Sequence, residues 1–433
     1  MDTVIIDLLE QYLERKKANL SEKTRSNSKI IYYYNEIVRF WNKLNFMIKK
    51  TLRSLEYKEF NNHQIAILLY LAYRMKFEGI LEEELYLEVD QISLKYPIIL
   101  DFIKKLKTFS WKRALEGKTE NEKLSLNKAI PSFFIERLSQ VMSIEQIKDN
   151  HETMNDIKKS NYFTVHVSSS IENTLNLCFI GNLQKLDNKN RSIFKKDTNI
   201  DHLYTLPREF KSELVSSELY QNGEILIVDK GSVAVIDVLD PKPHDIIGDL
   251  CAAPGIKTYL MTKHATRIIA SDFHVERANS MKKLLKHLNT PKIPIINADG
   301  IQFPVRDEYQ FDKILLDAPC TGSGTFLHNP ELKWRQSEKF LHQNTVLQKK
   351  LLKSALNLLK PEGILVYSTC SLYPEEGELQ IKNIIDTLEP LELPEWFSPS
   401  YRIENQTFPG TGRLFPAIHG TQGFFIGKFK KKG

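Results

Sequence analysis

The chain has 433 residues, of which 42% are hydrophobic and 26% are charged, and its net charge is +6 at pH 7. A chain of this length is expected to form two or three domains. We find no apolar run long enough to span a bilayer and no N-terminal signal-peptide pattern, so we expect no membrane partner. Four cysteines without disulfide-scaffold or metal-site spacing indicate free thiols in a reducing, cytoplasmic setting. The mildly basic charge permits a polyanionic partner without establishing one.

Residues 1–145 are predicted to be helices that form a first domain. Apolar residues of the opening segment, and again those from Ile65 to Ala72, follow a helical stripe. Pro131 suits the first turn of a further helix that carries Phe134, Leu138 and Met142 on one face. Such stripes are most often the core of a helical bundle. Lys and Arg residues between positions 15 and 29 would nevertheless give this domain one basic face.

Residues 146–240 are predicted to form a small α+β linker domain. The segment 162–167 alternates and is β-branched, which is typical of a strand, and 224–228 and 233–236 are further strand candidates. The polar stretch 187–198 is expected to be a loop. Cys178 lies in an apolar run and is expected to pack in the core.

From 241 to 433, predicted strands and helices alternate, which is typical of an α/β fold with a parallel, doubly wound sheet. We expect strands at 245–250, 268–270, 293–296, 311–316 and 364–367. Expected helices begin at 257, 275 and 337, and Pro361-Glu-Gly363 ends the last of them before the strand that precedes Cys370.

A cofactor loop is predicted at Cys251-Ala-Ala-Pro-Gly255, between a strand and a helix, where backbone N–H groups meet a ligand. Three successive predicted strands end near an acidic residue, namely Asp249, Asp272 and Asp299. Asp272 follows Asp249 at about the 20-residue spacing at which a carboxylate receives ribose hydroxyls. Dinucleotide and triphosphate motifs are absent from the sequence. S-adenosylmethionine, which has a ribose and an adenine but no phosphate, fits best.

Two cysteines follow predicted strands in segments that make sulfur chemistry useful. Cys320 ends Asp317-Ala-Pro-Cys320, and Cys370 lies in Ser368-Thr-Cys-Ser371. Taken singly, each would most simply be a buried structural cysteine. Because the ends of parallel strands meet at one rim of a sheet, two thiols there suggest covalent attack on a ring carbon.

Three segments appear in an order and spacing that resemble the Sun/Fmu-type RNA cytosine-5 methyltransferases, the group that includes the nucleolar Nop and NSun enzymes. They are Asp249–Thr258, Asp317–Thr325 and Ser368–Glu376. Arg413-Leu-Phe-Pro416 and Gly423-Phe-Phe425 are similar to that family's C-terminal motif. The resemblance covers residues from about 131 onward and implies a Rossmann-like methyltransferase domain. More loosely, the N-terminal helices resemble the all-α NusB-like RNA-binding domain of bacterial small-subunit rRNA members, and Pro131–Phe134 resembles the start of their linker domain.

The resemblance also implies roles for individual residues. Cys370 would be the nucleophile that adds to cytosine C6, Cys320 would assist product release, and Asp317 would hold the N3/N4 edge of the base. Lys257 would stabilise a thiolate or orient the base. Ile256 stands where the family usually has a second glycine. No metal is implied, and the cofactor-binding residues would be Cys251, Ala252, Ala253, Pro254, Gly255, Ile256, Lys257, Asp272, Arg277, Asp299 and Asp317.

The expected activity is therefore formation of 5-methylcytosine in RNA, in rRNA rather than tRNA by analogy with the NusB-like domain, by a cytoplasmic monomer. A rival enzyme would use Cys320 as the nucleophile, as the Pro-Cys of DNA cytosine methyltransferases is used. An amino-group methyltransferase is disfavoured because Asp317-Ala-Pro-Cys320 is not an Asp/Asn-Pro-Pro-aromatic motif. The rival of another class is a non-catalytic RNA-binding or ribosome-assembly factor that retains the fold.

Overall fold

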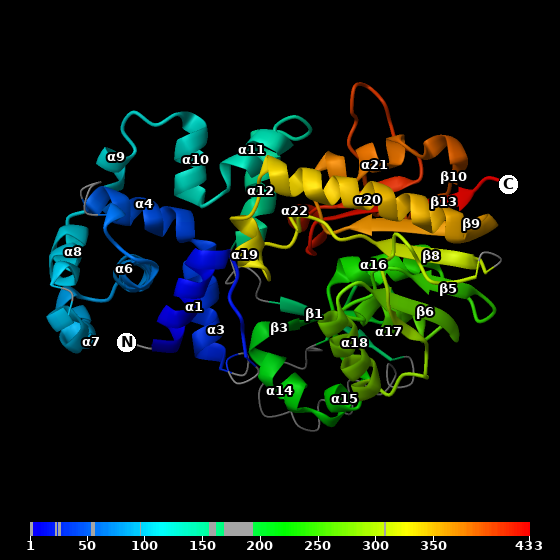
Figure 1. The fold of residues 1–433 in the computed structure, drawn as a ribbon, viewed down its shortest axis with the longest axis horizontal. Coiled ribbons are helices and arrows are strands. Elements are labelled where there is room, and N and C mark those ends of the chain that lie inside the picture. Colours follow the sequence, from blue (N-terminus) through cyan, green and yellow to red (C-terminus); the bar gives the residue numbers. More distant parts are fainter. Residues whose placement is uncertain are drawn as a thin grey trace. The chain divides into compact units, whose positions relative to one another are not determined.

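The computed structural model describes residues 3–21, 24, 27–52, 57–95, 97–155, 162–168, 194–306 and 309–433. The chain forms two compact units, and Figure 1 labels many of their elements. The first unit comprises Met1–Gln140 and Phe326–Ser337, and the second comprises Val141–Thr325 and Glu338–Gly433. The two units divide at residue 140, near the predicted boundary at 145, and the residues on both sides of 240 lie in the second unit.

The first unit is helical, as the sequence predicts. Its core is built from apolar stripes on α1, α3, α4, α6 and α8, with Leu9, Ile37 and Leu69 fully buried. Capping boxes at Asn61 and Thr119 start α6 and α10. The helices of the first chain segment are α1 (Thr3–Arg15), α3 (Ser28–Arg39), α4 (Trp41–Thr51), α6 (Asn62–Phe77), α7 (Glu82–Lys95), α8 (Ile98–Lys107), α9 (Trp111–Ala114), α10 (Glu120–Lys128) and α11 (Ser132–Leu138).

A short segment from far along the chain completes this helical unit. Phe326–Ser337, with α19 (Pro330–Lys333), follows the Cys320 region in sequence but belongs to the first unit. The buried Arg39 guanidinium donates to Phe326 O at 3.1 Å and to Leu327 O at 2.9 Å. Trp334 Nε1 donates to Val38 O at 2.6 Å. This segment, which lies inside the predicted 241–433 domain, thus packs with the helical unit.

The second unit contains a small antiparallel sheet of order β2-β3-β1-β4. Its strands are β1 (Tyr162–Val167), β2 (Lys195–Lys196), β3 (Leu203–Pro207) and β4 (Ile225–Ile227), which confirms the strand predictions at 162–167 and 224–228. The short β2 falls inside the predicted loop 187–198. Cys178 lies outside the described residues. Around this sheet lie α12 (Ile144–Asn155), η1 (Arg208–Phe210), α14 (Lys211–Ser216) and α15 (Glu218–Gln221).

The strand predicted at 233–236 is wrong, because these residues lie in helix α16 (Lys230–Leu239). Asp229 caps this helix by accepting from Gly231 N at 2.9 Å. The helix is buried on nearly all sides, so its apolar run lacks the polar face that would reveal a helical period.

The large sheet has the order β11-β12-β13-β9-β8-β5-β6-β7, and β10 also pairs with β13. Strands β5 to β9 are parallel, while β10 to β13 join antiparallel. The alternation predicted from 241 onward is confirmed. The strands are β5 (Ile246–Asp249), β6 (Arg267–Asp272), β7 (Ile295–Asn297), β8 (Phe311–Asp317), β9 (Leu359–Thr369), β10 (Leu388–Pro390), β11 (Ser398–Pro399), β12 (Thr411–Leu414) and β13 (Phe424–Lys431).

Helices cover both faces of the large sheet (Figure 1). α16, α17 (Ile256–Met261) and α18 (Val275–His287) pack on one face, and α20 (Glu338–Leu358) and α21 (Glu378–Lys382) pack on the other. Shorter helices are η2 (Pro374–Glu376), η3 (Ile385–Thr387) and α22 (Pro416–His419). Strand β9 begins at Leu359, and the predicted turn at Pro361–Gly363 is an irregularity within it, with Glu362 at φ 63°.

The sheet order reverses direction between β5 and β8. From β5 the chain proceeds outward to β6 and β7, and it then returns to place β8 and β9 on the other side of β5. Ligands of open α/β sheets bind beyond the carboxyl ends of the strands at such a point. Asp249 ends β5 and Asp317 ends β8, so the two carboxylates flank it. None of the described helices is long and apolar enough to cross a membrane.

Candidate active site

A cavity of about 180 Å³ lies at this point of the sheet. Seven of its lining residues were predicted from sequence: Cys251, Ala252, Ala253, Pro254, Ile256, Lys257 and Asp317. Five others were not among the predicted binding residues: Ile227, Val228, Asp229, Ser232 and Asp249. Four of these five come from the junction of β4 with α16, which sequence reasoning took for a linker. For Asp249, the fifth residue, the available sequence signal was its position at the end of the predicted strand before the small-residue loop.

Asp249 offers this cavity a buried oxygen. The residue is 1% exposed, and its Oδ2 accepts from Thr258 Oγ1 at 2.7 Å. Its Oδ1 has no hydrogen-bond partner among the described residues. Burial, with further contributions from Asp317 and Asp272, raises the pKa of Asp249 to about 7. An orphaned carboxylate oxygen of this kind fits a ligand that brings its own hydroxyl or ammonium donor.

The predicted ribose residue Asp272 lies behind the cofactor loop. It is 2% exposed, and it accepts from Ala253 N at 3.3 Å and from His274 N at 3.0 Å. Arg277 lies 3.4 Å from Asp272 and also donates to Ala253 O. Asp272 and Arg277 therefore fix the loop. Neither residue is among those that line the cavity.

Two further predicted cofactor residues take different places. Asp299 is exposed, and its Oδ1 accepts from Ile301 N at 2.9 Å, so it stands at the end of β7 outside the cavity lining. Gly255 is the N-cap residue before α17 and has φ 104°, and a Cβ there would lie 2.7 Å from Met281 Cγ. Only glycine fits that backbone conformation without strain.

The two catalytic candidates are brought together: Cys320 Sγ and Cys370 Sγ lie 3.1 Å apart, and both residues are partly exposed. The hydrogen bond with Cys370, together with burial, raises the pKa of the Cys320 thiol. Burial and nearby carboxylates raise the pKa of Cys251, which keeps that cofactor-loop thiol protonated.

Asp317 is held from two sides. Lys257 Nζ donates to its Oδ2 at 2.8 Å, and Ser368 Oγ donates to its Oδ1 at 2.7 Å. Ser368 is the residue opposite Asp317 in the β8–β9 register, two positions before Cys370. Burial lowers the pKa of Lys257, but Asp317 and then Cys370 outweigh it and raise the pKa overall. The lysine therefore stays charged beside the carboxylate and the thiol.

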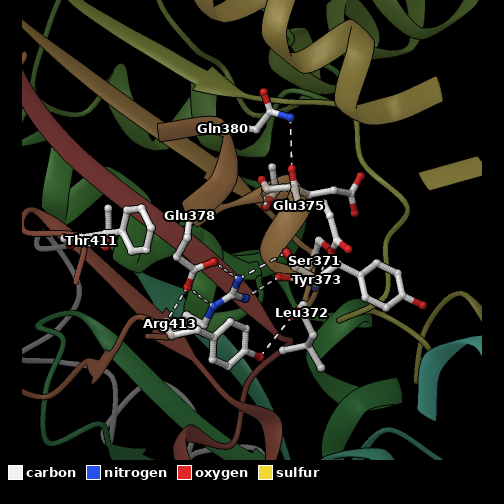
Figure 2. A network of polar contacts seen from close by, with 12 residues as sticks. Ser371, Leu372, Tyr373, Glu375, Glu378, Gln380, Thr411 and Arg413 are labelled. Carbon is white, nitrogen blue, oxygen red and sulfur yellow. Dashed lines mark hydrogen bonds and ion pairs between the residues drawn. The ribbon is translucent and has the colours of Figure 1, made fainter. Parts of the chain in front are cut away.

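A buried ion pair supports the segment that follows Cys370. Figure 2 shows the Arg413 guanidinium between the Glu378 carboxylate and the carbonyls of Ser371 and Tyr373. The Arg413–Glu378 contacts measure 2.8 and 2.6 Å, and both side chains are fully buried. Arg413 also lies over the Tyr401 ring, 4.0 Å from its centroid. The C-terminal motif thus reaches the site through the backbone after Cys370.

The Cys320 and Cys370 segments also touch directly. Gly324 N donates to Cys370 O at 3.0 Å, and Ser323 Oγ and Ser371 Oγ share a hydrogen bond of 2.9 Å. Gly324 O accepts from Gly423 N at 2.9 Å, and a Cβ on Gly324 would overlap the Gly423 backbone. Two glycines therefore allow three chain segments to meet beside the thiols.

Comparisons with known proteins agree with this geometry. Residues 236–430 match a family model described as 16S rRNA methyltransferase RsmB/F. The chain is 35% identical over 218 residues to the "Probable ribosomal RNA small subunit methyltransferase B" of Synechocystis, a match that covers 49% of each protein. It is 35% identical over 228 residues to the human "28S rRNA (cytosine(4447)-C(5))-methyltransferase", covering 49% of this chain and 28% of the human protein.

Among solved structures, a methyltransferase homologue from Pyrococcus horikoshii aligns with a TM-score of 0.58 at 29% identity, covering 72% of this chain and 99% of that one. Compared with the curated relatives, the chain matches about half the length of the Synechocystis protein and less of the human one.

Fold and cavity together define a Rossmann-like methyltransferase domain. Residues 236–430 match, more specifically, the methyltransferase model of RsmB/F, which confirms the resemblance drawn from the motifs. This family is of the S-adenosylmethionine-dependent class. The orphaned Asp249 oxygen and the small-residue loop 251–255 fit that cofactor, which would be held by Asp249, Cys251–Pro254 and Ile256.

Proposed function

We propose that the protein methylates C5 of cytosine in RNA. The observation that carries this proposal is the pair of thiols 3.1 Å apart next to Asp317, which itself lines the cofactor cavity. Bound S-adenosylmethionine supplies an electrophilic methyl group on its sulfonium. The residues of this chain have to make C5 nucleophilic and then restore the aromatic ring.

The chemistry requires a temporary bond to the base. Cytosine C5 is a poor nucleophile until a thiolate adds to C6, after which C5 carries the electron density that accepts the methyl group. A base then removes the C5 proton, and the C6–S bond breaks with return of its electron pair to sulfur. The target nucleotide has to leave its stack to be reached, so we expect a flipped or single-stranded cytosine.

The division of labour follows from the matching motifs. Cys370 attacks C6, and Cys320 assists release of the methylated product. Asp317, oriented by Ser368 and Lys257, accepts from the N4 amino group and favours protonation at N3. The charge of Lys257 stabilises the Cys370 thiolate, in keeping with the contribution of Cys370 to the raised pKa of Lys257.

Ribosomal RNA is the substrate that we favour over tRNA. The two curated relatives reported above are named for rRNA, and the helices of the first unit would form the RNA-contacting, NusB-like part. A cytoplasmic monomer suffices for this proposal.

The decisive experiment combines methyl transfer with adduct trapping. Wild-type protein should transfer labelled methyl groups from S-adenosylmethionine to RNA, and Cys370→Ala should abolish both transfer and adduct. Cys320→Ala should accumulate a covalent protein–RNA adduct that survives a denaturing gel. Adduct in Cys370→Ala would instead make Cys320 the nucleophile. Free, normally methylated RNA from Cys320→Ala would remove the role given to Cys320.

Two further outcomes decide whether the protein is an enzyme and which RNA it modifies. Absence of transfer to total RNA by the wild-type protein would favour a non-catalytic RNA-binding or ribosome-assembly factor. Bisulfite sequencing of RNA from a deletion strain should show one cytosine that loses its methyl group, and that position would identify the substrate.

A further inference from the structure

Glu376 is a buried carboxylate that joins the two cysteine segments. It ends η2, six positions after Cys370, and is 0% exposed. Its carboxylate accepts from Thr321 N at 2.9 Å and from Thr321 Oγ1 at 2.5 Å. Thr321 directly follows Cys320, so the Glu376 side chain, which belongs to the Cys370 segment, binds the backbone next to Cys320.

The same residue is tied to the end of β9. Glu376 O accepts from Tyr367 Oη at 2.9 Å and from Thr369 Oγ1 at 3.2 Å, and Thr369 directly precedes Cys370. Glu376 therefore contacts the residue after one cysteine and the residue before the other.

Gln348 on α20 completes this arrangement. Its Nε2 donates to Glu376 Oε1 at 3.0 Å and to Pro319 O at 2.8 Å. The residues on both sides of Cys320, Pro319 and Thr321, are thus held by one hydrogen-bonded pair of side chains. Buried networks with several satisfied donors fix a unique geometry, because each lost bond leaves a polar group unpaired.

Glu376 does not touch the reacting atoms. It is absent from the residues that line the cavity, and its carboxylate oxygens face donors. Burial raises the pKa of Glu376, and hydrogen bonds from Ser371, Thr321 and Gln348 oppose that rise. The carboxylate accordingly acts as an acceptor that organises its neighbours.

We propose that Glu376 is the positioning residue that holds Cys320 against Cys370, and that its loss slows product release more than covalent attack. This inference rests on the proposed function. Cys370 has other supports, since Arg413 holds the carbonyls of Ser371 and Tyr373 and β9 is paired on both edges. Glu376 and Gln348 hold the residues on both sides of Cys320, Thr321 and Pro319, so the Cys320 thiol should be the more sensitive of the two.

The test compares Glu376→Ala with Glu376→Gln in single-turnover reactions that follow adduct formation and release separately. Since a misplacement of about 1 Å can cost about 100-fold in rate, Glu376→Ala should release methylated RNA roughly 10- to 100-fold more slowly and accumulate adduct. The rate of adduct formation should stay within about threefold of the wild-type rate, a much smaller change than the roughly 100-fold loss in release. Glu376→Gln should restore release, because its amide oxygen still accepts from Thr321 N and Gln348.

Control variants separate positioning from general loss of structure. Glu404→Ala breaks an exposed ion pair with Lys382 (3.1 Å) and should change neither step. Thr321→Val removes one donor while keeping the backbone N–H, so it should slow release less than Glu376→Ala does and remains informative if Glu376→Ala fails to fold. Equal slowing of both steps in Glu376→Ala or Thr321→Val would overturn the inference, as would a Glu376→Gln variant no better than Glu376→Ala.

A measurement without RNA tests the positioning itself. Phenylarsine oxide binds two adjacent thiols and releases water, and it should be retained by the wild type and lost from Cys320→Ala. Glu376→Ala should weaken its retention about tenfold, by analogy with the rate losses of misplaced groups. Unchanged retention would overturn the inference. If Glu376→Ala retained phenylarsine oxide less well but the wild-type protein methylated no RNA, the proposed function would be wrong and the positioning role of Glu376 would still hold.

Discussion

The Lys257 ammonium nitrogen lies 2.8 Å from Asp317 Oδ2, which joins the first turn of α17 to the end of β8 across the reversal point of the sheet. The lysine side chain is 14% exposed and the carboxylate 28% exposed. A partly buried pair of this kind is costly to break on one side, because the remaining charge keeps its burial but loses its partner.

Lys257→Met should therefore lower kcat/KM for methyl transfer by roughly 100-fold or more, as expected for a misplaced catalytic group. Lys257→Arg should retain part of the activity. The pKa of Lys257 is raised in the folded state, so the stability it contributes is present below its unfolded pKa of about 10.4 and is lost only at higher pH. A difference in Tm between wild type and Lys257→Met should thus persist from pH 6 to about 9. A difference that vanishes within this range would contradict the pairing.

Asp249 predicts a loss of stability with rising pH in a lower pH range than Lys257 does. Its pKa is about 7 in the fold against about 3.9 when unfolded, so the folded state holds a proton that the unfolded chain releases. Stability should therefore fall as pH rises from about 4 to 7, by an amount on the order of 4 kcal/mol at most. Asp249→Asn should flatten this slope and raise Tm at pH 8, measured by calorimetry. Asp299→Asn, at an exposed strand end, is the matched control and should leave the slope unchanged.

The affinity for the cofactor should increase with rising pH, whereas the stability decreases. A donor from the bound ligand favours the charged form of Asp249, so S-adenosylmethionine should bind more tightly as pH rises through 7. In Asp249→Asn, isothermal titration should show weaker binding that does not vary over that range. A pH-dependent affinity in the variant would place the titrating group elsewhere.

Arg413 predicts a large loss of stability from one substitution. Arg413→Met leaves Glu378 charged, fully buried and without its partner, which should cost about 3–5 kcal/mol. Hydrogen exchange of the amides in 371–378 should report this loss. The double variant Arg413→Met/Glu378→Leu should recover part of it, because no uncompensated charge remains. Lys382→Met, which breaks an exposed pair in the same unit, should cost less than about 1 kcal/mol. Additive effects in the double variant would contradict direct coupling.

Gly324→Ala tests the close approach of the cysteine segments. The added Cβ would overlap the Gly423 backbone, which cannot swing away as a flexible side chain would. The variant should lose about 1–3 kcal/mol and should also retain phenylarsine oxide poorly, because the Cys320 segment has to shift. Gly420→Ala is the control: its φ of 62° gives backbone strain, but nothing lies within 4 Å of the new Cβ. Equal arsenical retention in the two variants would count against the contact.

The site is predictable from sequence where its residues follow strands. Asp249, Asp317 and Cys370 each come at or just after the end of a parallel strand, and such ends share one edge of a sheet. The motifs therefore indicate which side chains gather, and the 3.1 Å separation of the two sulfurs agrees with that expectation. The cavity-lining residues from β4 and α16 were not predicted. The buried helix α16 has no polar face, so its sequence does not show a helical period.

The sequence alone determined the class of domain, and it predicted a cofactor loop and two candidate thiols, because local motifs and strand periodicity encode such features. Only the tertiary structure decided that Phe326–Ser337 belongs to the helical unit, that Asp249 keeps an orphaned oxygen, and that Glu376 and Arg413 lie buried against the cysteine segments. These relationships join residues far apart in the chain through burial and hydrogen bonding. No local sequence pattern predicts these contacts. Tertiary packing, and not the spacing of residues along the chain, brings hydrogen-bond donors to a buried carboxylate.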